Sequence, residues 1–178
     1  QFNSYFREIA VELAKIGYAQ DFTNSFTDSL IANHKFTEVR RIFYQLARPN
    51  SINSKWFLQG CSDSSYINVE MALDRIYKDN QLSTMHLSQA MDKVKNIQGY
   101  THNIKVKYCE YGVEVYPEMR GSFIRTLVSM SGEKYEFRTR ILALQSLQRL
   151  NYLDKEFAFN LFDGCINFNS RLNTPALD

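Results

Sequence analysis

The chain has 178 residues, enough for one domain of usual size or two small ones, and 44% of them are hydrophobic while 22% are charged. This composition excludes an intrinsically disordered chain and allows a substantial core. The net charge of +2 gives no electrostatic basis for binding nucleic acid or an anionic membrane, and no apolar run approaches the ~20 residues that span a bilayer.

The first hundred residues predict consecutive helices. Apolar residues recur at spacings of three and four, which is the period of an amphipathic helix. Seven glycines and three prolines are too few for the tight turns of a many-stranded fold. Gly17 is expected to end the first helix, and Pro49 the third, because the residue before a proline is pushed out of helical angles. The helices are expected over residues 3–17, 22–31, 36–46, 54–58, 69–77 and 84–97.

The segment 101–117 departs from this pattern. Apolar and aromatic residues alternate with charged ones on both sides of Gly112. Alternation with a glycine-containing turn is typical of two paired strands, so we favour a β-hairpin over residues 103–116. The competing interpretation is one helix with a shared face made by Val106, Cys109, Val113 and Tyr116.

The last third, residues 118–178, predicts further helices with very short breaks between them. We expect them to begin near residues 118, 136, 154 and 170. A short pattern recurs 33 residues along the chain, first as Arg138, Ala143 and Leu144 and then as Arg171, Ala176 and Leu177. Self-similarity at ~20–50 residues indicates stacked helical units that bury each other's apolar faces.

This pattern resembles the second helix of a HEAT-type repeat. The resemblance rests on an acidic turn, an apolar residue, an arginine, a small residue and a leucine, here Glu136, Phe137, Arg138, Ala143 and Leu144. It covers about a third of the chain and implies an all-α solenoid that binds or braces other proteins. An irregular helical bundle is the alternative fold.

The expected organisation has three parts. Residues 1–100 form an N-terminal helical half, residues 101–117 a connector or the β-hairpin, and residues 118–178 the HEAT-like array, together one compact domain. The chain begins in helical periodicity and ends where a helix is under way, so we expect a fragment of a larger helical protein. A processed terminus with a frayed tail is the simpler alternative.

The residues that usually carry chemistry are scattered. The histidines, His34, His86 and His102, do not fall at a metal-ligand spacing, and there is no HExxH or CxxC motif. Phosphate-binding glycine loops and the GxSxG elbow are missing as well. We therefore expect no catalytic residues, no cofactor, no bound metal and no hydrolase activity.

The cysteines give a weak indication of compartment. Cys61, Cys109 and Cys165 are odd in number and far apart, so they do not form a disulfide framework. Reduced thiols together with no recognisable signal peptide favour a cytoplasmic location.

The candidate partner-binding residues lie in the last third. Phe157, Leu161 and Cys165 fit one face of a helix that begins at Asp154, whereas Phe159 and Phe162 lie partly off that face. Such a helix is either packed between neighbours or presents an apolar patch to a partner. Arg138 and Arg140 form a basic cluster that could contact an acidic partner. The candidates are Phe159, Phe162, Ile166, Phe168, Arg138 and Arg140.

The leading hypothesis for function is a non-enzymatic scaffold or protein–protein interaction module. Its partner is another protein or another domain of the same protein, with self-association through the C-terminal end. The alternative is an accessory helical domain of an enzyme, since gluzincin zinc aminopeptidases carry HEAT-like C-terminal arrays; their catalytic HExxH motif is missing here. A helical-repeat RNA-binding module is the second alternative, disfavoured by the near-neutral charge.

Overall fold

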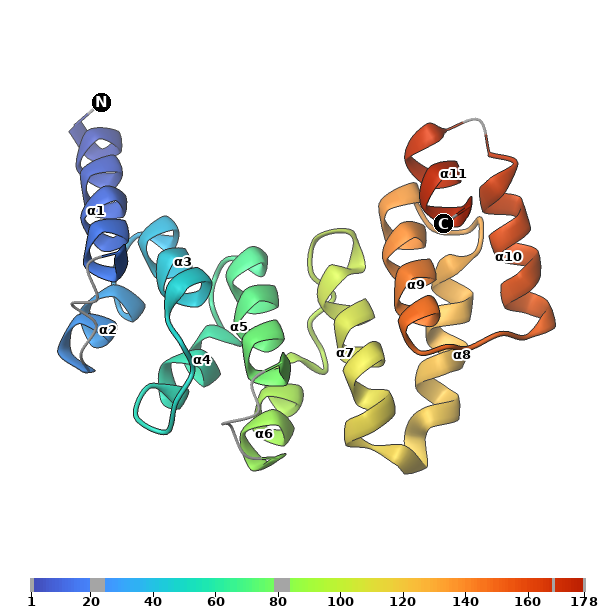
Figure 1. The fold of residues 1–178 in the computed structure, drawn as a ribbon, viewed down its shortest axis with the longest axis horizontal. Helices are drawn as coiled ribbons and strands as arrows, with labels where there is room; N and C mark the ends of the chain where they lie inside the picture. Colours follow the sequence, from blue (N-terminus) through green and yellow to red (C-terminus); the bar gives the residue numbers. More distant parts are fainter. Residues whose placement is uncertain (1, 20–24, 79–83, 168, 178) are drawn as a thin grey trace. The chain divides into compact units, whose positions relative to one another are not determined.

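A computed structural model describes residues 2–19, 25–78, 84–167 and 169–177 of the chain. These residues are helical with short connections, and no strand occurs among them (Figure 1). The all-α prediction is therefore confirmed. The helices are α1 (Phe2–Ala19), α2 (Ser25–Ala32), α3 (Thr37–Leu46), α4 (Ser54–Gly60), α5 (Tyr66–Lys78), α6 (Thr84–Val94), α7 (Asn103–Val115), α8 (Arg120–Ser131), α9 (Phe137–Arg149), α10 (Lys155–Cys165) and α11 (Ser170–Leu177), with single 3-10 turns at Tyr100–His102 and Pro117–Met119.

The helices divide into two compact units, Gln1–Val94 and Lys95–Asp178. In the first unit α1 packs on α3 and α3 on α5, while α2 lies against α4 and α4 against α6. The odd and even helices thus form two adjacent rows. The second unit repeats this arrangement with α7, α9 and α11 in one row and α8 and α10 in the other.

The core of the first unit is aromatic where α3 meets α4. Phe43 and Phe57 are fully buried with ring centroids 4.7 Å apart. The Tyr44 ring lies directly over Gly60, where a Cβ atom would come within 2.5 Å of its Cε1 atom. A side chain at residue 60 would therefore push α3 and α4 apart.

The core of the second unit is mainly aliphatic. It is built from α7, α8, α9, α10 and α11 and includes Leu127, Ala143, Leu144, Leu147 and Leu172. Helices α9 and α10 begin where the sequence predicts, because acidic residues cap them. The Glu136 carboxylate accepts the amide N–H of Thr139 at 3.1 Å, and that of Asp154 accepts the amide N–H of Phe157 at 2.7 Å.

The predicted β-hairpin over residues 103–116 is wrong, since this segment is helix α7. Ile104, Val106 and Val113 are all buried, so α7 is enclosed on more than one side. That enclosure spreads apolar residues around the helix and produces an apparent alternation. Gly112 serves close packing instead of a turn, because a Cβ atom there would lie 2.8 Å from the Phe123 ring.

The backbone just before α7 has unusual angles, and α1 ends later than the sequence predicts. Thr101 and His102, just before α7, have left-handed backbone angles with φ of 52° and 59°. Such angles are costly for a β-branched residue such as threonine. The prediction that Gly17 ends the first helix is wrong, because α1 continues to Ala19. No helix of the described residues is long and apolar enough to cross a membrane.

Candidate interaction surface and polar site

Three large apolar side chains lie in one row along α10 and its C-cap residue, Ile166. Phe159, Phe162 and Ile166 are 70%, 63% and 66% exposed. Their spacings of three and four residues place them on the same face of the helix. We call these three residues the α10 stripe. Phe168, the fourth predicted apolar candidate, lies outside the described residues.

The opposite side of α10 is fixed to the core. Phe157 is buried, and Gly164 allows close approach of α11, since a Cβ atom there would lie 3.1 Å from that of Ala176. The Asn160 amide donates hydrogen bonds of 2.9 Å to the Val128 carbonyl and the Ser131 hydroxyl on α8. Because these contacts set the rotation of α10, the α10 stripe is held outward.

The two candidate arginines have different surroundings. Arg138 is exposed; it donates to the Tyr100 hydroxyl at 2.9 Å, and its guanidinium lies 5.8 Å from the centre of that ring. Arg140 is instead buried, and it donates to Asp163 at 2.6 Å and to the Ser131 carbonyl at 3.1 Å. We assign Arg140 the structural role of tying α9 to α8 and α10.

A second exposed apolar face lies on α1 and was not predicted. The sequence predicts an amphipathic helix here, and the apolar face of such a helix ordinarily packs on the core. In the structure the small residue Ala14 is buried where α1 packs on α3, and the large residues point outward. The exposed residues are Tyr5, Phe6, Ile9, Leu13 and Ile16.

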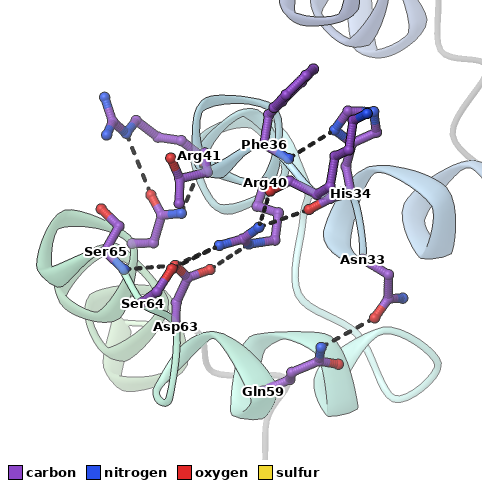
Figure 2. A network of polar contacts seen from close by, with 12 residues as sticks. Asn33, His34, Phe36, Arg40, Arg41, Gln59, Asp63, Ser64 and Ser65 are labelled. Carbon is purple, nitrogen blue, oxygen red and sulfur yellow. Dashed lines mark hydrogen bonds and ion pairs between the residues drawn. The ribbon is translucent and has the colours of Figure 1, made fainter. Parts of the chain in front are cut away.

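A polar network in the first unit was also not predicted from the sequence. Arg40 follows the α2–α3 connection, and Asp63 lies in the α4–α5 connection (Figure 2). Arg40 donates through Nε and Nη2 to the two Asp63 carboxylate oxygens at 2.6 and 3.0 Å, and through Nη1 to the His34 carbonyl at 2.7 Å. Figure 2 shows the guanidinium between the two connections, which it ties together.

Beside this ion pair lies a hollow of about 310 Å³. Polar residues of α3, α4 and the connections α2–α3 and α4–α5 form its walls. The lining residues are Asn33, His34, Lys35, Arg40, Tyr44, Gln59, Ser62, Asp63 and Ser64. We call this space the Arg40 hollow. Its volume is at the lower end of the ~300–1,000 Å³ that is usual for small-ligand sites.

Asp63 and His34, which both line the Arg40 hollow, have lowered pKa values. Burial opposes ionisation of Asp63, but hydrogen bonds from Arg40 and from the Ser65 amide outweigh it and lower the pKa of that carboxyl. Burial lowers the pKa of His34, and the positive charges of Lys35 and Arg40 lower it further. The site is therefore electropositive at its His34 side, with His34 neutral at pH 7.

The buried thiols are poor nucleophiles. Burial raises the pKa of Cys61 to about 12 and that of Cys109 to about 11, so neither carries a thiolate at neutral pH. Within the described ranges, no group of three or more His, Cys, Asp or Glu side chains is placed to hold a metal ion.

With this geometry in hand, comparison with known proteins adds no relative: no protein-family model, curated protein or solved structure matches the chain.

Proposed function

We propose that this chain is a helical scaffold that binds an apolar helix of a partner protein through the α10 stripe. The observation that carries the proposal is the row formed by Phe159, Phe162 and Ile166, each about two-thirds exposed on a helix whose other side is fixed to the core. A continuous row of large apolar side chains is uncommon on the surface of a protein that acts alone.

The shape of the stripe favours a helix as the partner. From Phe159 to Ile166 the row rises by about 10 Å, which is two helical turns. A partner helix with apolar residues at the same spacing can lie along it, as helices do in apolar grooves. The two-row packing within each unit supports this proposal, because its helices already recognise each other through such faces.

The energy available from the stripe is moderate. Burying a full Phe or Ile side chain contributes about 1.5–3 kcal/mol, so three side chains that are two-thirds exposed offer about 3–6 kcal/mol. Association costs at least about 4 kcal/mol in lost freedom of motion. The stripe is therefore expected to act as the centre of a larger contact. Leu153, just before α10, is also highly exposed and could extend it.

The proposal can be tested with a synthetic amphipathic peptide that carries leucines at helical spacing and with a scrambled peptide of the same composition. The wild-type chain should bind the first peptide and a hydrophobic dye. Phe162→Ser should reduce both signals without lowering the thermal midpoint. The matched control is Phe26→Ser, which changes an equally exposed phenylalanine on α2.

Three results would contradict the proposal or redirect it. Unchanged peptide binding by Phe162→Ser would place the interaction elsewhere. Unfolding of Phe162→Ser would show that the row is closed core. Concentration-dependent sedimentation that Phe162→Ser abolishes would identify a second copy of the chain as the occupant of the stripe.

A further inference from the structure

The Tyr44 ring is buried, whereas its hydroxyl oxygen is not one of the enclosed polar atoms of the described residues. Tyr44 is 2% exposed, and its ring is packed on Gly60 and edge-on against Phe43. No hydrogen bond joins this oxygen to another described residue, so it is left to solvent or to a ligand.

This hydroxyl belongs to the Arg40 hollow. The backbone carbonyl of Tyr44, near the end of α3, accepts a hydrogen bond of 3.1 Å from Arg75. The hydroxyl end of the ring instead lies close enough to Asp63 and Arg40 for their charges to affect its pKa, and all three residues line the hollow. The hydroxyl is therefore available to a molecule in the hollow and not to the Arg75 side.

The hydrogen-bonding capacity left in the hollow is rich in donors. Both oxygens of Asp63 are already bonded, to Arg40 and to the Ser65 amide. His34 uses Nδ1 to accept the Phe36 amide, so its neutral ring carries the proton on Nε2. The further donors are the hydroxyls of Tyr44 and Ser62. Lys35 also lines the hollow, and its ammonium lies 5.0 Å from the centre of the neighbouring Phe36 ring.

The charges of the hollow also favour an anionic ligand. Lys35 and Arg40 are cationic, Asp63 is anionic and His34 is neutral, so the hollow carries a net charge of about +1 at pH 7. Its 310 Å³ equals the share of liquid volume taken by about ten water molecules. The size and the donors thus suit a small molecule that is anionic and rich in acceptors.

We propose that the Arg40 hollow binds a small oxyanion, either a carboxylate or a phosphate. The Tyr44 and Ser62 hydroxyls donate hydrogen bonds to its oxygens, and Lys35 supplies the positive charge. The ion pair of Arg40 and Asp63 ties the two connections together and forms one wall of the site. This binding is independent of the α10 stripe, which lies in the other unit.

The test is a titration of the isotope-labelled chain with inorganic phosphate and, separately, with acetate, at an ionic strength held constant with sodium chloride. Amide resonances of residues 62–64 should move in a saturable way with at least one of the two anions. The pKa of His34 should rise on binding, because a nearby anion offsets the positive charges of Lys35 and Arg40. The ring resonances of His86 and His102, which do not line the hollow, serve as internal references.

The decisive variant is Tyr44→Phe, which removes the hydroxyl and leaves the packed ring. It should weaken anion binding about tenfold or more, as expected for loss of a hydrogen bond to a charged group. It should not lower the thermal midpoint, since no protein partner is lost. Tyr5→Phe, on α1 and outside the hollow, is the matched control and should bind as the wild type does.

Saturation by acetate alone would identify a carboxylate ligand, and saturation by phosphate alone would identify a phosphate. Two outcomes would overturn the proposal. One is the lack of a saturable shift with either anion, which would mean that the hollow holds water only. The other is equal affinity of Tyr44→Phe and the wild type, which would show that the anion binds elsewhere.

Discussion

Removal of the Arg149 guanidinium should reveal a buried charge at Glu110. The Glu110 carboxylate on α7 is buried and accepts hydrogen bonds from Arg149 at 2.6 and 2.8 Å and from the Ser146 hydroxyl at 2.7 Å. Arg149→Met would keep much of the apolar stem and remove the charge. Breaking a fully buried ion pair costs about 3–5 kcal/mol. Since the Arg149 side chain is half exposed and Ser146 remains, we expect about 2–3 kcal/mol at pH 7.

The pH dependence of this loss distinguishes the charge from simple packing. In the wild type, burial raises the pKa of Glu110, but the hydrogen bonds from Arg149 and Ser146 outweigh it, so the pKa is lowered. The pair therefore stabilises the fold above the unfolded pKa of about 4.3 and loses this contribution as the pH falls. In Arg149→Met the burial prevails, the pKa of Glu110 rises, and protonation restores part of the stability. The difference between variant and wild type should shrink as the pH falls.

Urea denaturation at pH 7 and at pH 4.5 measures this difference. Glu110→Gln combined with Arg149→Met should lose most of the pH-dependent part, because no buried charge remains. Arg125→Met changes an exposed arginine on α8 and should stay within about 0.5 kcal/mol of the wild type. A destabilisation by Arg149→Met that is equal at both pH values would refute the reasoning and leave packing as the cause.

Two further predictions concern stability. Leu144 is 3% exposed, so Leu144→Ala should lower the free energy of unfolding by about 2–5 kcal/mol. Leu153 is 73% exposed, so Leu153→Ala should change it by no more than about 0.5 kcal/mol. Equal urea midpoints for the two variants would contradict the assignment of Leu144 to the core. Thr101→Gly should raise the free energy of unfolding by about 0.5–1 kcal/mol, because glycine adopts the φ of 52° without strain but costs more chain entropy, and a lowered urea midpoint would show that the left-handed backbone is not strained.

Much of the secondary structure follows from the sequence alone, because helices and their ends depend on neighbours within a few residues. The period of apolar residues identifies the helices of both units, and Glu136 and Asp154 mark the start of α9 and α10 through bonds to amides three residues away. The sequence also shows that Phe159 and Phe162 lie off the face that Phe157 shares with the core, but it left open whether they pack against a neighbour or are exposed.

Other features depend on which helices pack together. Residues that are close in the sequence do not determine this packing. Enclosure of α7 on more than one side removed its helical period, so that it was predicted as a hairpin. On α1 the period identified an apolar face, but the helix packs through Ala14 instead.

The charged residues show the same limit. Arg40 and Arg140 have the sequence character of surface arginines, yet each pairs with an aspartate 23 residues away, Asp63 and Asp163. Such a pair forms only when tertiary packing brings two helices or connections together and excludes water from the space between them. The same holds for the Arg40 hollow, because only packing on Gly60 buries the Tyr44 ring beside that ion pair. Local periodicity determined the helices of this protein, whereas long-range packing decided which of their side chains are core, ion pairs or free surface.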